Sequence, residues 1–234
     1  MKQQSQCSSL LIGGFILVAL ATSAEAQVGP DLSSPDACFT SFVTAFEKGD
    51  SASLRIACQG DRAKKEWIVA LSAQWRALHQ LEAALTSRFG QDWKQADAGQ
   101  TIAAKIQEVA DEELRSDLIA ARRTTLPEGG LMLVVNEGDL DELQPRIVPA
   151  DGRWKLDLDS LSNYFGAGDA PVLRSVASAA SGLAQKIEAG GFPTLDNAAD
   201  AIVDKITEAR DVGPVTQPTT RAARNVDAAA GRRP

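Results

Sequence analysis

Few side chains of this sequence are suited to catalysis, and the clearest candidates are His79 and Glu82. His79 is the only histidine in the chain. Because a spacing of three residues places two side chains on one face of a helix, His79 could act as a general base that Glu82 orients. More often, such a pair is a solvated contact on a helix flank that contributes about 0.2–0.5 kcal/mol. We therefore assign no catalytic residue.

Aromatic side chains are candidates for a ligand site, because pockets for apolar ligands usually have aromatic walls. The candidates for lining such a pocket are Trp67, Trp75, His79 and Trp154. Trp67 and Trp75 also belong to a stripe of apolar residues at helical spacing, which favours packing in the core over contact with a ligand. The ligand of this pocket would be a small apolar molecule.

The cysteines predict a disulfide bridge. Cys7 lies within an expected export signal, so the exported chain keeps Cys38 and Cys58. An even number of cysteines in an oxidising compartment usually means a bridge. If residues 35–48 and 51–58 form an antiparallel helical hairpin, these two thiols come close together. The alternative is that both are small buried hydrophobic side chains. Two cysteines and a single histidine argue against a structural zinc site.

Charge and missing motifs exclude several classes of protein. The formal net charge of −7 offers no basic face to a nucleic acid. The P-loop, the dinucleotide glycine fingerprint and the Gly-x-Ser-x-Gly elbow are absent. Glu137, Asp139, Asp141 and Glu142 lack the EF-hand pattern and are interpreted as a solvated turn. We expect neither a metal nor a cofactor.

The first 26 residues have the features of a secretory signal peptide. Lys2 precedes an apolar run over residues 10–21, and the small residues Ala24 and Ala26 suit a signal peptidase. As a helix, this run reaches only about 18 Å, which is too short to span a bilayer. Cys7 precedes the run, so no lipid anchor is expected. We expect cleavage after Ala26, a periplasmic or secreted protein, and no permanent membrane span.

Helical spacing and capping residues predict helices at both ends of the exported chain. Ser34 and Pro35 are typical of a helix start, and Asp61 and Thr194 are further expected N-caps. In the first half, helices are expected over residues 35–48, 51–58, 61–89 and 101–115. Two more helices, separated by Gly190–Gly191, form a hairpin within residues 166–210 that packs on the domain. A disordered tail is expected over residues 211–234.

Between these helices, the pattern becomes that of strands. Extended runs are expected over residues 118–126, 131–135, 143–149 and 153–158. Asp151-Gly152 favours a type I′ hairpin turn between the last two runs. Trp154 and Leu156 alternate with charged residues, so one face of the last strand is apolar. The charges of Arg122–Arg123 suit an exposed sheet edge. We expect an α+β fold with a small antiparallel sheet of three or four strands packed against helices.

Two stretches of the chain resemble NTF2-like proteins, the superfamily of SnoaL and ketosteroid isomerase. Ser34 to Leu54 is similar to the opening helix, Gly-Asp turn and short second helix of that superfamily, and Asp151 to Leu161 is similar to its late strand with an inward tryptophan. Together they cover about a quarter of the exported chain. The resemblance implies, over residues 27–165, a curved sheet that wraps helices into a cone with an apolar pocket. The two long helices expected between the stretches depart from this pattern and would shrink the sheet.

Three functions remain open. The first is an exported, non-catalytic NTF2-like domain for binding or envelope assembly, which the scarcity of catalytic side chains favours. The second is an isomerase or dehydratase that uses a buried carboxylate with His79, and it requires an open apolar cavity. The third is a mainly helical interaction module in which residues 170–210 dock a partner; an exposed apolar stripe there would favour it, and a fully buried stripe would count against it. The partner would be an unknown protein or a small apolar ligand.

Overall fold

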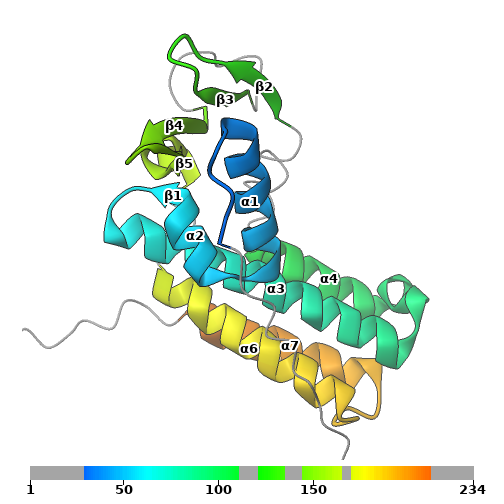
Figure 1. Cartoon of the computed structure of the whole chain (residues 1–234). Coiled ribbons are helices and arrows are strands. Elements are labelled where there is room, and N and C mark those ends of the chain that lie inside the picture. Colours follow the sequence, from blue (N-terminus) through cyan, green and yellow to red (C-terminus); the bar gives the residue numbers. More distant parts are fainter. Residues whose placement is uncertain (1–28, 111–120, 135–143, 165–169, 212–234) are drawn as a thin grey trace, which may run out of the picture.

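The protein is described by a computed structural model over residues 29–110, 121–134, 144–164 and 170–211 (Figure 1). The predicted signal peptide, the acidic residues 137–142 and residues 212–234 of the predicted tail lie outside these ranges. The helices are α1 (Pro35–Lys48), α2 (Ser51–Ala57), α3 (Arg62–Phe89), α4 (Asp97–Val109), α6 (Ala170–Glu188) and α7 (Leu195–Arg210). Two 3-10 helices are η1 (Gln91–Gln95) and η2 (Leu158–Tyr164). Among the described residues, no helix combines the length and the apolar composition that crossing a membrane requires.

Local capping contacts explain where several helices begin and end. The side chain of Ser34 accepts a hydrogen bond from the N–H of Ala37 at the start of α1, which confirms the predicted cap. Asp61 and Thr194 cap α3 and α7 in the same way, through bonds to the third residue along the chain. Gly49 ends α1 in the left-handed conformation, with φ of 67°, which glycine adopts without strain.

The sheet has five strands, β1 (Cys58–Gln59), β2 (Arg122–Thr125), β3 (Leu131–Val134), β4 (Arg146–Ala150) and β5 (Arg153–Asp157), in the order β1-β5-β4-β3-β2. The α+β class is confirmed, but the prediction of a purely antiparallel sheet of three or four strands was wrong. The added strand, β1, pairs parallel with β5, with Cys58 opposite Leu156. Two residues are too few to show an alternating pattern, so the pairing becomes visible only in three dimensions.

The antiparallel part of the sheet follows the sequence closely. Asp151 and Gly152 have φ angles of 53° and 72°, which are the positive angles that a type I′ turn requires. Leu156 and Ile147 lie opposite each other across β4 and β5, and both are fully buried. Strand β2 forms one edge of the sheet and is exposed along its whole length, so Arg122–Arg123 lies where the charge pattern predicts.

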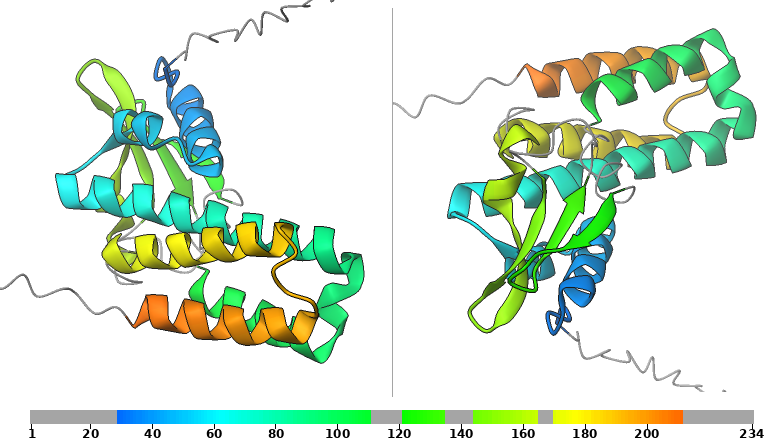
Figure 2. Two further views of the ribbon diagram at one scale, coloured as in Figure 1. Left: turned by 90° about the horizontal axis from the view of Figure 1, so that it is seen from below. Right: turned by 90° about the horizontal axis from the view of Figure 1, so that it is seen from above.

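One hydrophobic core, which we call the sheet core, lies between the sheet and the helices α1, α2 and the first half of α3 (Figure 2). Its side chains include Phe42, Leu54, Trp67, Leu71, Leu133, Ile147 and Leu156. The buried hydroxyl of Ser72 on α3 donates a hydrogen bond to the carbonyl of Phe46 on α1, at 2.6 Å. This bond ties the two helices together and satisfies a polar group that would otherwise be costly to bury.

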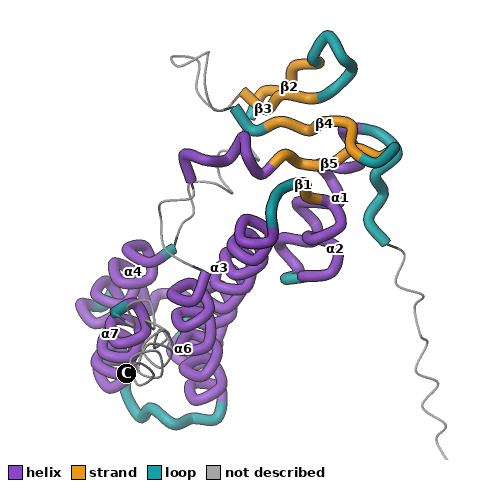
Figure 3. Tube along the Cα trace, turned by 90° about the vertical axis from the view of Figure 1, so that its left-hand side faces the viewer, coloured by secondary structure: helices purple, strands orange, loops and turns teal. Residues whose placement is uncertain are grey.

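A second core, the helical core, is enclosed by the second half of α3 together with η1, α4, α6 and α7. These four long helices form a bundle, which Figure 3 shows nearly end-on. Its side chains include Leu78, Leu81, Leu85, Trp93, Ile102, Val176, Ile187, Ile202 and Ile206. Helix α3, with 28 residues and a length of about 42 Å, and helix α6 contribute to both cores, so the two share a continuous framework.

Candidate functional site

The structure places His79 on the exposed surface of α3. Its ring stacks on Trp75, with centroids 4.0 Å apart, and its Nδ1 lies 3.0 Å from the Trp75 carbonyl oxygen. Glu82, the carboxylate expected to orient it, instead forms an ion pair with Lys94, with Nζ and Oε1 2.7 Å apart. His79 and Glu82 therefore lie on a solvated helix flank and are not paired with each other as a general base and its orienting group.

The tryptophan candidates lie in separate surroundings. Trp67 is only 5 % exposed and fills the sheet core. Trp75 is half-buried and packs against Phe46, with ring centroids 6.1 Å apart. Trp154 is half-buried at the margin of the sheet core, where its backbone N–H donates to the Leu32 carbonyl. The four candidates, Trp67, Trp75, His79 and Trp154, therefore do not line a common cavity.

Cys38 and Cys58 are both buried free thiols, so the predicted disulfide was wrong. The helical hairpin of α1 and α2 forms as expected, but α2 ends at Ala57 and Cys58 already belongs to strand β1. The Cys38 thiol approaches the carbonyl of Ala57, with Sγ and O 3.8 Å apart, rather than the other sulfur. Burial raises the pKa of Cys38 to about 11 and also raises the pKa of Cys58 well above its usual value.

The raised pKa values of these thiols predict how alkylation and the free energy of unfolding depend on pH. Because the reactive form is the thiolate, Cys38 and Cys58 should resist alkylation by iodoacetamide between pH 7 and 9 in the folded protein. Above pH 9, an unfolded thiol loses its proton while the Cys38 thiol, with a pKa of about 11, keeps it, so the free energy of unfolding should fall as the pH rises from 9 to 11.

Mass spectrometry after alkylation in denaturant, without reductant, tests the thiols directly. We expect both cysteines to be modified there, and neither to be modified in the native protein at pH 8. An intact mass two hydrogens lower, with no alkylation in denaturant, would show that the two sulfurs are bonded after all.

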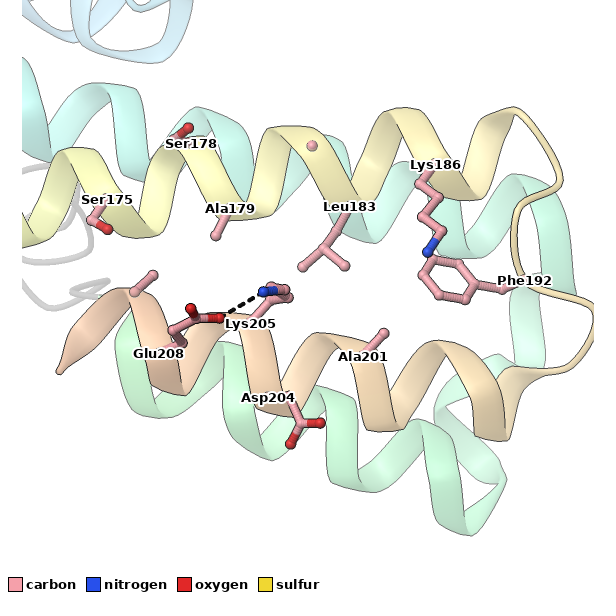
Figure 4. A pocket seen from close by; sticks show the side chains of 12 residues that line it. Ser175, Ser178, Ala179, Leu183, Lys186, Phe192, Ala201, Asp204, Lys205 and Glu208 are labelled. Atoms are coloured by element: carbon pink, nitrogen blue, oxygen red, sulfur yellow. Dashed lines mark hydrogen bonds and ion pairs between the residues drawn. The ribbon is translucent and has the colours of Figure 1, made fainter. Parts of the chain in front are cut away.

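A groove of about 700 Å³ lies between α6 and α7, and we call it the α6–α7 groove (Figure 4). Its apolar lining consists of Ala179, Leu183, Phe192, Ala201 and Ala209. Leu183, Phe192 and Ala209 belong to the helical core and form the base of the groove, whereas short and charged side chains of α6 and α7 lie on its solvent side. The groove is therefore open, shallow and only partly apolar.

Charged side chains lie around this groove. Lys186 extends over the ring of Phe192, with Nζ 4.5 Å from the ring centroid. On α7, Lys205 and Glu208 form an ion pair at 2.6 Å, and their hydrogen bond raises the pKa of Lys205 and lowers that of Glu208. With Asp204, the lining holds two positive and two negative groups. Figure 4 shows Lys186 and Phe192 at one end and Ser175 and Glu208 at the other.

A smaller hollow of about 390 Å³ lies on the opposite side of α6, between α6 and α3. Ser178 lines both hollows, so α6 stands between them as a ridge of short side chains. The apolar stripe of α6 does not mark this surface, because the short side chains of the ridge lie on another face of the helix. The available signal was the spacing of Ser175, Ser178, Ala179 and Gly182 on the other face of the same helix.

No known family model, curated protein or solved structure matches this chain. Its function must therefore be inferred from the residues of its surface and interior. Within the described ranges, no group of three or more histidine, cysteine, aspartate or glutamate side chains is placed to hold a metal ion. The α6–α7 groove is the feature with the size and the mixed chemistry of a binding surface.

Proposed function

We propose that this chain is an exported, non-catalytic protein that binds a helix of a partner protein in the α6–α7 groove. The observation that carries the proposal is the groove itself: an open channel of about 700 Å³ with an apolar floor and balanced charges at its margins. Helices commonly bind in such grooves through small and apolar side chains, while charges at the rim set their orientation. Export is supported by the signal-like residues 1–26.

A non-catalytic role is supported by the interior of the α+β part. An isomerase of the ketosteroid type needs an open apolar cavity that holds a carboxylate and hydrogen-bond donors. Here Phe42, Trp67 and Leu71 occupy the space between the sheet and its helices, and each is almost completely buried. His79 lies outside this core. These observations favour binding over the isomerase or dehydratase hypothesis.

The outer face of the helical hairpin is favoured over its apolar stripe as the docking surface. The stripe residues of α6 and α7, among them Leu173, Val176, Ile187, Ile202 and Ile206, are buried within the protein. A partner therefore cannot reach the stripe without opening the bundle. The groove on the other side is accessible in the folded monomer and remains the surface that a partner can occupy.

We also propose that residues 27–165 are a divergent NTF2-like domain. The order of α1, the Gly49-Asp50 turn, α2 and a short strand, followed late in the chain by the β4–β5 hairpin with Trp154 on its core face, supports this relationship. The long helices α3 and α4 and the filled sheet core depart from a pocket-bearing member of that superfamily. The proposed domain would serve as a scaffold for the hairpin of α6 and α7 rather than as a domain that binds a ligand in its own pocket.

Site-specific photo-cross-linking in the cells that produce the protein tests this function. A photoreactive residue at Gly182 has room, because a Cβ there meets nothing within 4 Å. A matched control carries the same residue at Thr44, which is exposed on α1. We expect a discrete cross-linked protein from position 182 but not from position 44, in the exported fraction and on chains that begin at Gln27. Equal or absent cross-linking at the two positions would overturn the proposal.

A further inference from the structure

We propose that the occupant of the α6–α7 groove is helix α6 of a second copy of this chain, so that the protein forms a two-fold symmetric dimer. This inference rests on the proposed function, because it names the partner of the same groove. A two-fold interface requires each copy to present both halves of the contact. The chain does so, since the ridge of α6 and the groove lie side by side on one face.

The exposed surface of α6 has a shape that can enter such a groove. Between Arg174 and Gln185, no exposed or half-buried side chain of α6 is larger than serine. These short side chains are Ser175, Ser178, Ala179, Ser181 and the glycine at 182. They cover about 12 Å of helix and let a second helix axis approach closely. Arg174 does not obstruct this approach, because it forms an ion pair with Glu66 of α3.

The charges of the groove favour an antiparallel arrangement of the two α6 helices. Lys186 lies at one end, and Glu208 lies at the other end, beside Ser175 (Figure 4). A two-fold axis between Ala179 and Gly182 places Lys186 of each copy against Glu208 of the other, where Lys186 joins the existing Lys205–Glu208 pair, so the same contact forms twice. Each copy has a net charge of −7, yet the four charged lining residues of the groove cancel. The groove itself therefore adds no net charge to the contact between two copies.

The length of the contact sets the expected strength of the dimer. A helix pair over about 12 Å buries less surface than the roughly 1,200 Å² of a standard stable interface. We therefore expect a dimer in the micromolar range that weakens as salt screens the reciprocal pairs. Sedimentation equilibrium of the full exported chain, over low to high micromolar concentrations and at two salt concentrations, measures this dissociation constant.

Charge-reversal variants provide the decisive test. In the Lys186→Glu variant, two glutamates face each other at each of the two symmetric contacts between residues 186 and 208. In the Glu208→Lys variant, two lysines do so. Each variant alone should associate at least about tenfold more weakly than the original chain. When the two variants are mixed, both pairs become opposite in charge again, so the mixture should form a heterodimer. Arg153→Glu, on the exposed sheet hairpin, makes the same change of charge away from the groove and should leave the dimer unchanged.

A chain that stays monomeric at every concentration would overturn this inference. So would a dimer that survives both reversals, or a mixture that associates no better than its components. The cross-link at Gly182 separates this failure from that of the proposed function, when two differently tagged copies are expressed together. An adduct that joins both tags supports self-association. An adduct with another protein leaves the proposed function standing without the dimer, and the absence of any groove adduct removes both.

Discussion

Replacement of Gly99 by alanine is expected to lower the free energy of unfolding by about 3 kcal/mol, at the upper end of the usual cost of overpacking. Gly99 lies in the first turns of α4, where a Cβ atom would stand 1.7 Å from the carbonyl oxygen of Trp93. The obstructing atoms belong to the backbone of η1 and cannot rotate away. Helix α4 would have to move away from η1, which would disturb the buried Trp93 ring in the helical core.

Gly182→Ala is the matched control for this substitution. Gly182 also lies within a helix, but a Cβ atom there meets nothing within 4 Å. Because alanine restricts the unfolded chain more than glycine, this variant should gain about 0.5–1 kcal/mol. Chemical denaturation at low protein concentration measures both. A Gly99→Ala protein as stable as the original would contradict the close contact between η1 and α4.

Replacement of Phe42 by alanine is expected to cost about 3–5 kcal/mol, because it removes a large side chain from the sheet core and leaves a cavity. Phe42 is 2 % exposed, and its ring lies 6.0 Å from that of Phe46. Ile56→Ala is the control, since Ile56 is a large apolar side chain that is 45 % exposed, and its loss should cost less than about 1 kcal/mol. Guanidinium titration followed by circular dichroism gives both values. Similar losses in the two variants would contradict the described packing of α1.

The two destabilising variants together test whether the cores unfold as one. Phe42 belongs to the sheet core, whereas Gly99 packs against η1 at the helical core. Since α3 and α6 pass through both, each variant should shift a single transition, detected alike by tryptophan fluorescence and by circular dichroism. A variant in which one signal is lost well before the other would show that the halves unfold separately.

The parts of the fold that depend on neighbouring residues could be predicted from the sequence. Ser34, Asp61 and Thr194 each form a cap with a backbone group three residues away, so their types and positions are sufficient evidence. Asp151-Gly152 likewise determines its own turn. The apolar stripes of α3, α6 and α7 identify the faces that are buried, because helical spacing alone decides which side chains share a face.

The parts that depend on distant residues could not be predicted. Helix α4 begins at Asp97, before the predicted start at Thr101, and its Gly99 lies against the backbone of Trp93, a contact that only the packing of η1 on α4 reveals. Strand β1 exists only because β5 lies beside it. Cys38 and Cys58 have a suitable spacing for a bridge, but the start of β1 at Cys58 changes their relative placement.

The α6–α7 groove also could not be predicted from sequence patterns, because it too depends on how distant residues pack. His79 and the tryptophans were selected by residue type, whereas five of the twelve residues that line the α6–α7 groove are alanines and serines, which no motif marks. Such a surface is created when two helices pack at a given distance, and that distance depends on the whole bundle. The charges of the groove come from both helices. Lys186 on α6 and Glu208 on α7 are 22 positions apart in sequence but line the same groove.

The shared helices have a consequence for how this protein can be taken apart. Helix α3 supplies Trp67 and Leu71 to one core and Leu78 and Leu85 to the other, without a break between them. A recombinant fragment that stops inside it, or that omits α6, would expose apolar surface from both halves at once. We therefore expect truncation within α3, or removal of α6, to give insoluble pieces rather than independently folded modules.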